Sequence, residues 1–263
     1  MIPIALTIAG SDPGGGAGIQ ADLKTFQRFH VFGTAVITLI TVQNTTRLSR
    51  TEILSADLVG EQIDAVLEDL PPRAIKTGAL GNEAIVRAIA ARRFGAPLIV
   101  DPVMLSSAGT PLIDPTAQQA LRDLLLPKAF LVMPNLAEAA ALTGNEVRNP
   151  EQMREAARAI AGLGPRAVLV KGGHLESGDA LDILFDNGAF TEFTSPRIET
   201  RHTHGTGCTY SAAVTALIAE GLALEQAVRG AKAFVYEAIR QAPGIGAGAG
   251  PLNHWAIIAV SHP

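Results

Sequence analysis

Short apolar runs alternate with longer amphipathic stretches along most of the chain. Residues 4–10 and 35–42 are short apolar runs. The run at 35–42 is apolar on both faces, as in a buried parallel strand. The segments AIKTG, PLIVDP, AFLVMPN and AVLVKGG have the same character. The amphipathic stretches predict helices over 19–30, 56–69, 82–94, 116–124, 152–163, 206–220 and 223–241. This alternation predicts an α/β fold, a three-layer αβα sandwich whose central sheet is mostly parallel with helices on both faces.

The alternation is interrupted once, near residues 181–193. The segment LDILFDNGAFTEF places Asp186, Asn187 and Gly188 between two alternating runs, a pattern that predicts a β-hairpin. Further on, GIGAGAGP at 244–251 predicts a loop before a short C-terminal segment. No change of composition marks a linker, and no internal repeat is present. We therefore expect residues 1–263 to form a single domain.

Composition narrows the class of protein and its surroundings. Of 263 residues, 48% are hydrophobic and 17% charged, enough apolar material for a continuous core. The formal net charge of −4 gives no electrostatic reason to expect a nucleic acid or a membrane surface as partner. The single cysteine is consistent with a reducing compartment, and neither a signal peptide nor a bilayer-spanning run is apparent. These features predict a soluble cytoplasmic protein.

Polar residues gather where the predicted strands end. In an open α/β sheet, ligands bind beyond the carboxyl ends of the strands, so side chains at these ends share one edge. A solvated turn accounts for any one polar strand end, but not for six of them. We therefore expect one crowded site, built from Gly10-Ser11-Asp12, Gln43-Asn44, Lys76-Thr77-Gly78, Asp101, Asn135 and Lys171-Gly172-Gly173.

A first glycine-rich segment, residues 14–18, follows a predicted strand and precedes a helix. The dinucleotide pattern G-x-G-x-x-G fails, because Ile19 stands where the third glycine belongs and Gln43, not an acidic residue, closes the second strand. A P-loop is excluded because the chain contains no Gly-Lys pair. The segment is either a tight turn or a loop that lets backbone amides approach a ligand.

A second glycine-rich segment, HTHGTGC at 202–208, opens an apolar helix. Unpaired amides and the helix dipole make such an N-terminus an anion site, and they would shift the thiol of Cys208 toward thiolate. An inert buried cysteine is one alternative. A metal site of His202, His204 and Cys208 is another, although the spacing matches no common zinc pattern. We favour a functional cysteine at an anion site.

The motifs ALTIAGSDPGGGAGIQADLKTF, TVQNT, KTGAL, VDPVM, MPNLAEA, VLVKGGHL and HTHGTGCTYSAA resemble those of hydroxymethylpyrimidine kinases in order and spacing, over roughly residues 4–240. That family has a ribokinase-like fold. The resemblance implies ATP-dependent phosphorylation of 4-amino-5-hydroxymethyl-2-methylpyrimidine to its monophosphate and then its pyrophosphate, in thiamine biosynthesis. It also implies ATP and Mg²⁺ as cofactors and a homodimer.

On the acceptor side, the resemblance makes Gln43 the residue that reads the pyrimidine. Its amide presents a donor and an acceptor in one plane, which suits an amino group beside a ring nitrogen. Asp22 would bind the hydroxymethyl group. Many relatives have KIGML where this chain has KTGAL, so Ala79 leaves more room around the ring. The remaining expected substrate contacts are Gly10, Ala17 and Val103.

For the transfer itself, Cys208 resembles the catalytic residue of the family, at the place where sugar kinases of the superfamily use an aspartate base. The amides of Gly205, Thr206 and Gly207 would stabilise the transferred phosphoryl group. Asp101 and Glu138 resemble magnesium-network residues that act through coordinated water. Nucleotide contacts would come from Lys171, Asn135 and, less strongly, from Lys232, for which a solvated helix face is the alternative.

Three rival functions remain to be weighed. A pyridoxal or pyridoxine kinase would use the same scaffold, but the relatives that act on vitamin B6 carry Met in the place of Gln43. A regulatory protein without catalysis is disfavoured because Cys208, its flanking glycines and Asp101 are all present. A nicotinamide dehydrogenase is disfavoured by the failed fingerprint.

Overall fold

A single twisted sheet forms the middle of the molecule. The computed structural model describes residues 2–106, 109–173, 175 and 178–257, and the strand order in this part of the chain is β3-β2-β1-β4-β5-β6-β7-β8-β9. The neighbouring strands β2, β1, β4, β5, β6 and β7 run parallel to one another. At the two edges, β3, β8 and β9 pair antiparallel. The strands are β1 (Ile4–Ser11), β2 (Phe32–Gln43), β3 (Leu48–Ile53), β4 (Ala74–Thr77), β5 (Leu98–Val100), β6 (Leu131–Val132), β7 (Ala167–Gly172), β8 (Ala180–Asp186) and β9 (Ala189–Ser195).

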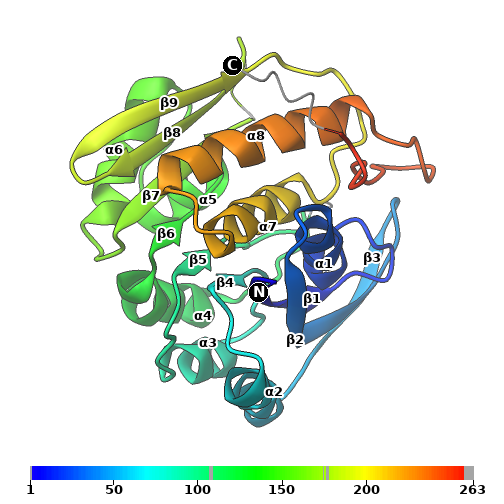
Figure 1. Ribbon diagram of the computed structural model, residues 1–263. Coiled ribbons are helices and arrows are strands. Elements are labelled where there is room, and N and C mark those ends of the chain that lie inside the picture. Colours follow the sequence, from blue (N-terminus) through cyan, green and yellow to red (C-terminus); the bar gives the residue numbers. More distant parts are fainter. Residues whose placement is uncertain (1, 107–108, 174, 176–177, 258–263) are drawn as a thin grey trace.

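Helices cover both faces of the sheet, which confirms the predicted three-layer sandwich (Figure 1). One layer consists of α1 (Gly18–Arg28), α7 (Thr206–Ala219) and α8 (Leu224–Arg240). The other layer consists of α2 (Ala56–Asp69), α3 (Glu83–Ala90), α4 (Pro115–Ala120), α5 (Leu136–Thr143) and α6 (Pro150–Ala161). After α4, the chain continues through a π-helical segment, η1 (Leu121–Leu125), and a 3₁₀ turn, η2 (Leu126–Lys128). No helix in the described part of the chain is long and apolar enough to cross a bilayer.

The sheet separates two apolar cores. Along β1, Leu6 and Ile8 point into the core beneath α2–α6, while Ala5 points into the core beneath α1, α7 and α8. Central strands are therefore buried on both faces, because helices cover each side. The run at 35–42, which was expected to be buried on both faces, lies in β2 next to the edge strand β3 and leaves Ile40 and Val42 exposed. Every residue of β7 is buried in this way.

Most of the predicted elements form, and the structure adds two that the pattern does not predict. The helix expected over 56–69 is α2, and the hairpin is β8–β9, with Asn187 and Gly188 at φ of 50° and 82°, as a tight two-residue turn requires. The loop predicted at 244–251 has no helix or strand. The additional elements are the edge strand β3 and the short helix α5. Of the C-terminal segment expected after the loop, residues 258–263 lie outside the described residues.

The chain order creates a crevice at one edge of the sheet. From β1 the chain crosses to β2 on one side and later returns to β4 on the other side, so the strand order reverses around β1. In open α/β sheets, the carboxyl ends of the strands on either side of such a reversal hold the ligand. The residues expected to bind substrate follow these same strand ends.

Candidate active site

A large cavity, of about 1160 Å³, follows the carboxyl ends of the strands and reaches the N-terminus of α7. It is large enough for a nucleotide together with a second small molecule. Among the residues to which the resemblance gives a role, only Asp22 does not line it. Of the polar strand ends expected in the crowded site, five residues do not line it either: Asn44, Lys76, Thr77, Gly78 and Gly172. The expected residues on its wall are Gly10, Ala17, Gln43, Ala79, Asp101, Val103, Asn135, Glu138, Lys171, Gly205, Thr206, Gly207, Cys208 and Lys232.

The first glycine-rich segment is a tight turn organised by Asp12. The amides of Gly14, Gly16 and Ala17 donate to the Asp12 carboxylate at 2.8, 3.1 and 2.9 Å. Because these amides are already engaged, they are not a phosphate cradle, and the alternative of a tight turn holds. Asp12 itself is 2% exposed, and the sequence pattern indicates it only as part of a strand end.

The second glycine-rich segment crosses the first at close range. Gly205 is the N-cap of α7 with φ of 81°, and a Cβ at this position would lie 1.7 Å from the carbonyl oxygen of Gly16. Only glycine fits both constraints. An anion site requires a helix start that no side chain caps, and no side chain caps α7.

The amide of Thr206 is already engaged, because it donates to the carbonyl of Thr203 at 3.2 Å. This removes one of the three amides expected to meet the phosphoryl group. The next amides in the first turn of α7 are those of Gly207 and Cys208, and both residues line the cavity.

Cys208 is not a thiolate in this environment, which corrects the expectation drawn from its helix position. Burial raises the pKa of its thiol to about 11, against the opposing effect of the Lys76 charge. The charges of Asp22 and Asp101 raise this pKa further. Desolvation and the two carboxylates outweigh the charge of Lys76 and the hydrogen bond from the amide of Gly18, which both lower this pKa.

A buried ion pair lies beside the first turn of α7. Lys171 Nζ donates to Asp101 Oδ1 at 2.8 Å, and Ser211 Oγ donates to Asp101 Oδ2 at 2.9 Å. Burial opposes the charge of Lys171, but the carboxylates of Asp101 and Glu138 raise its pKa above the ordinary value. A Cβ on Gly207 would lie 3.5 Å from Lys171 Nζ, so a permanent cation adjoins the helix N-terminus.

Glu138 and Asn135 share a capping box at the start of α5. The amide of Glu138 donates to Asn135 Oδ1 at 2.9 Å, and the amide of Asn135 donates to Glu138 Oε2 at 2.8 Å. Burial raises the pKa of Glu138 to about 7, although the nearby charge of Lys171 opposes this shift. The two residues therefore fix the helix and also place a titratable carboxyl on the cavity wall.

Asp22 lies beneath the cavity rather than on its wall. Its carboxylate accepts hydrogen bonds from Lys76 Nζ and Thr7 Oγ1, each at 2.6 Å, and both charged side chains are 0% exposed. In this arrangement Asp22 does not present an oxygen to a hydroxymethyl group. Lys76 likewise faces inward, in contrast to its expected place in the crowded site.

Lys232 is neither on a solvated face nor unpaired. Its Nζ donates to Asp182 Oδ2 at 2.6 Å, and Asp182 Oδ1 also accepts from the amide of Gly172 at 3.0 Å. Both side chains line the cavity, and Asp182 is not among the expected residues. The sequence feature that could have identified Asp182 is a polar residue at a position of the hairpin strand β8 that faces inward.

The alternative metal site of His202, His204 and Cys208 does not form. Within the described ranges, no three His, Cys, Asp or Glu side chains come together as metal ligands. Instead, His204 Nε2 lies 2.9 Å from Asp12 Oδ2 and ties the loop before α7 to the loop after β1.

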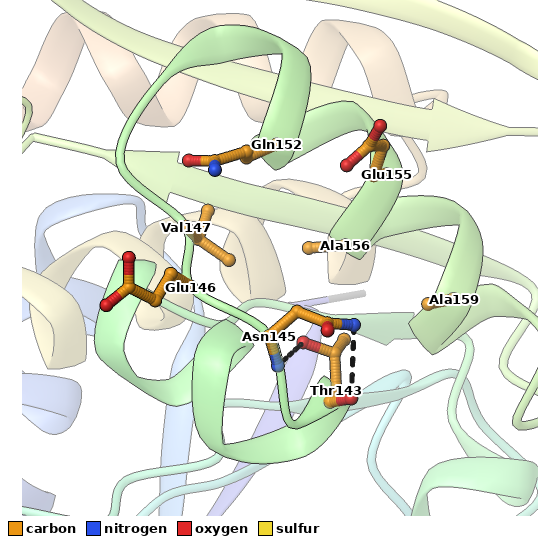
Figure 2. A pocket seen from close by; sticks show the side chains of 8 residues that line it. All are labelled: Thr143, Asn145, Glu146, Val147, Gln152, Glu155, Ala156 and Ala159. Atoms are coloured by element: carbon orange, nitrogen blue, oxygen red, sulfur yellow. Dashed lines mark hydrogen bonds between the residues drawn. The ribbon is translucent and has the colours of Figure 1, made fainter.

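A second, much smaller hollow of about 50 Å³ lies between α5 and α6 (Figure 2). Asn145 and Thr143 on its wall hydrogen-bond to each other. This volume has room for a water molecule or two and for no substrate. The chemistry therefore belongs to the large cavity.

Comparison with known proteins agrees with this architecture. A hydroxymethylpyrimidine/phosphomethylpyrimidine kinase of Rhizobium meliloti is 49% identical over 97% of this chain and 98% of its own length. A phosphomethylpyrimidine kinase structure from Clostridium difficile superposes with a TM-score of 0.80, at 41% identity over 90% and 99% of the two chains. The ADP complex of Bacillus subtilis pyridoxal kinase superposes with a TM-score of 0.89, at 37% identity over 97% and 98%.

A reversed strand order, a cavity at the strand ends, and a helix N-terminus beside a buried lysine define a small-molecule kinase of the ribokinase-like fold. The model of the phosphomethylpyrimidine kinase family matches residues 12–253. This chain belongs to that family.

Proposed function

We propose that this chain transfers the γ-phosphate of ATP to 4-amino-5-hydroxymethyl-2-methylpyrimidine and then adds a second phosphate to give the pyrophosphate for thiamine synthesis. The observation that carries the proposal is the cavity itself. It places Gln43, an amide reader, at one part of a wall that also holds the N-terminus of α7 and Lys171. A relative that is 49% identical over nearly its whole length is named for both phosphorylations.

The acceptor ring is assigned to the part of the cavity near β1 and β2. Gln43 closes β2 and reads the amino group and adjacent ring nitrogen. Around the ring we place Gly10, Ala17, Ala79 and Val103, all of which line the cavity. The small side chain of Ala79 gives room for the 2-methyl group or for a shifted ring.

The transfer is assigned to the first turn of α7. The hydroxyl oxygen of the acceptor attacks the γ-phosphorus, the bond to the β–γ bridging oxygen breaks, and ADP leaves. Cys208, once ionised, takes the hydroxyl proton. The amides of Gly207 and Cys208, together with Lys171, stabilise the charge on the phosphoryl oxygens. Gly205 holds this turn in place, and Thr206 lines the cavity while its amide and its hydroxyl both donate to the carbonyl of Thr203.

The donor side carries oxygen ligands suited to Mg²⁺. Asp101 and Glu138 line the same cavity, and Glu138 is a buried carboxyl whose proton a cation would displace. Mg²⁺ held by Asp101 and Glu138 would neutralise charge on the nucleotide phosphates. Both carboxylates accept hydrogen bonds in the described structure, which supports contact through water. Asn135, Lys171 and Lys232 complete the nucleotide side of the wall.

Mg²⁺ affinity is expected to rise with pH because of Glu138. With a pKa of about 7, raised from 4.5, this carboxyl is mostly protonated at pH 6 and mostly ionised at pH 8. Titrating Mg²⁺ at fixed ATP should therefore show about tenfold tighter activation at pH 8. Glu138→Gln should remove this dependence; a wild-type activation constant that stays flat between pH 6 and 8 would refute it.

An assay that resolves products tests the function. Supplied with ATP, Mg²⁺ and the hydroxymethylpyrimidine, the protein should form the monophosphate first and the pyrophosphate later, with one ADP released at each step. Pyridoxine in the same assay is the matched competitor. If pyridoxine is phosphorylated with the higher kcat/KM, the pyrimidine assignment is wrong and the rival vitamin B6 kinase takes its place.

A cytoplasmic homodimer is part of the proposal. Ile40 and Val42 of β2 are 44 and 52% exposed and lie on the same face of the sheet near its β3 edge, an apolar pair suited to contact with a second copy. Val42→Asp should therefore shift the mass measured by light scattering toward the monomer, while Glu61→Lys on the surface of α2 should not. A wild-type protein that is monomeric at all concentrations would rule out the dimer.

A further inference from the structure

Ser211 lies in the second turn of α7, between the start of this helix and the buried pair of Asp101 and Lys171. The residue is 0% exposed and does not line the large cavity. Its Oγ lies 2.9 Å from Asp101 Oδ2, 3.0 Å from the carbonyl oxygen of Gly207 and 3.1 Å from that of Cys208. A hydroxyl carries one proton, so these three oxygens compete for a single hydrogen bond.

Asp101 is the strongest of the three acceptors. Hydrogen bonds to a carboxylate are about twice as strong as those between neutral groups, and this carboxylate is only 1% exposed. The carbonyls of Gly207 and Cys208 belong to α7, where each accepts from the amide four residues further on. A buried carboxylate oxygen without a donor is costly. Ser211 therefore donates to Oδ2 of Asp101.

The carboxylate of Asp101 is held from two sides. Its Oδ1 accepts from Lys171 Nζ at 2.8 Å, and its Oδ2 accepts from Ser211. Asp101 directly follows β5 and Lys171 belongs to β7, so the lysine reaches across the end of β6 to form the pair. The serine comes from a helix on one face of the sheet. Rotation of the carboxylate would draw each oxygen away from its donor, and the two bonds together fix it.

The fixed carboxylate determines where the ammonium of Lys171 lies. A Cβ on Gly207 would lie 3.5 Å from Lys171 Nζ and 3.8 Å from Asp101 Oδ2, so the pair is packed against the first turn of α7. A second carboxylate, that of Glu138, also attracts this ammonium, and both carboxylates raise the pKa of Lys171. Glu138 belongs to α5, in the opposite helix layer from α7. A carboxylate of Asp101 that is free to turn would let the ammonium leave the first turn of α7.

We propose that Ser211 is a positioning residue for phosphoryl transfer: it fixes the carboxylate of Asp101, which in turn holds Lys171 Nζ at the first turn of α7. The inference rests on the proposed function, because it uses Lys171 as a group that stabilises the charge on the transferred phosphoryl oxygens. Ser211 itself touches no reacting atom.

Ser211→Ala is the direct test, because it removes the hydroxyl and leaves Asp101 Oδ2 without its donor. We expect kcat to fall about tenfold, while the KM for the pyrimidine changes by less than about twofold, since the wall around Gln43 is untouched. Ser211→Thr keeps a hydroxyl and should restore most of kcat.

Thr215→Val is the matched control on the same helix. Thr215 is also 0% exposed, and its Oγ1 donates to the carbonyl of Ser211 at 2.7 Å, one turn further along α7. This variant loses a buried hydroxyl that has no contact with Asp101. It should lower the melting temperature as Ser211→Ala does, but kcat should stay within about twofold of the wild type. An equal fall of kcat in both variants would assign the effect to helix stability and overturn the inference.

A double-mutant comparison tests whether Ser211 acts through Lys171. In a Lys171→Met background the ammonium is absent, so the further change Ser211→Ala should lower the residual kcat by less than about twofold. A tenfold fall in this background too, or wild-type turnover of the single variant Ser211→Ala, would overturn the inference. Should Ser211→Ala give no folded protein, Ser211→Cys keeps nearly the same size with a weaker donor, and an intermediate kcat is expected. A wild-type protein that does not phosphorylate the pyrimidine contradicts the proposed function itself, and the same kcat comparison can then be made with pyridoxine.

Discussion

Replacing Cys208 by alanine is expected to lower kcat by about 100-fold at pH 8, with little change in either KM. General-base catalysis contributes about 10²–10⁴-fold, and the lower end applies because the thiol, with a pKa of about 11, is mostly protonated at this pH. Only the thiolate accepts the proton, so kcat of the wild type should climb between pH 8 and 9.5. Ionisation of Glu138, whose pKa is about 7, is nearly complete at pH 8, so it does not account for a rise in kcat above that pH.

The control for this result is Cys208→Asp. A carboxyl ionises at lower pH than the thiol, so this variant should recover part of the activity near pH 7 and respond less steeply to pH. Stopped assays from pH 6 to 9.5 on the wild type and both variants measure all three profiles. If Cys208→Ala keeps wild-type turnover, the proton goes elsewhere, and the amides and Lys171 carry the transfer without this base.

Replacing Lys76 by methionine is expected to cost about 3–5 kcal/mol of unfolding free energy, the range for removing one partner of a buried ion pair. Lys76 and Asp22 are both 0% exposed, and the pKa of Lys76 is raised by the Asp22 charge although burial opposes it. Without the ammonium, the Asp22 carboxylate keeps only Thr7 as a hydrogen-bond donor in the described structure. Urea unfolding followed by circular dichroism measures the loss.

Two further variants give this prediction its controls. The double variant Lys76→Met/Asp22→Asn removes both charges, so it should be more stable than Lys76→Met alone. Arg50→Met breaks the exposed pair with Glu52 and should change stability little, since exposed ion pairs contribute little. If Lys76→Met is as stable as Arg50→Met, the buried pair does not hold this part of the core.

Sequence patterns predict the fold because long periodic segments determine it. The stretch at 56–69 shows a clear helical period and ends where the pattern ends. The helix α5 escapes prediction because LAEAAALT is apolar on nearly every side and only eight residues long. Its capping box, Asn135 and Glu138, is visible in the sequence, but the resemblance assigns both residues to ligand binding alone. The edge strand β3 escapes prediction because LSRTEI is half polar and partly exposed.

The candidate site is predictable as a set of strand ends but not as a set of contacts. Alternation along a strand does not reveal that Lys76 turns inward to Asp22 while Lys171 meets Asp101 at the cavity. A helix N-terminus likewise suggests a thiolate at Cys208, and only the three-dimensional burial shows that the thiol keeps its proton. These outcomes depend on neighbours that lie far apart along the chain.

The order of the layers also bears on how the chain folds during synthesis. Each strand from β4 to β9 adds to an edge that already exists, so the sheet grows outward as the ribosome releases it. The layer of α7 and α8 is made last, however. A nascent chain that ends before Thr206 leaves apolar side chains of one sheet face, among them Ile99 and Leu131, open to water. Because α7 and α8 cover this face only at the end of synthesis, we expect such truncated chains to bind chaperones and to aggregate. The exposure ends once the ribosome has released α7 and α8.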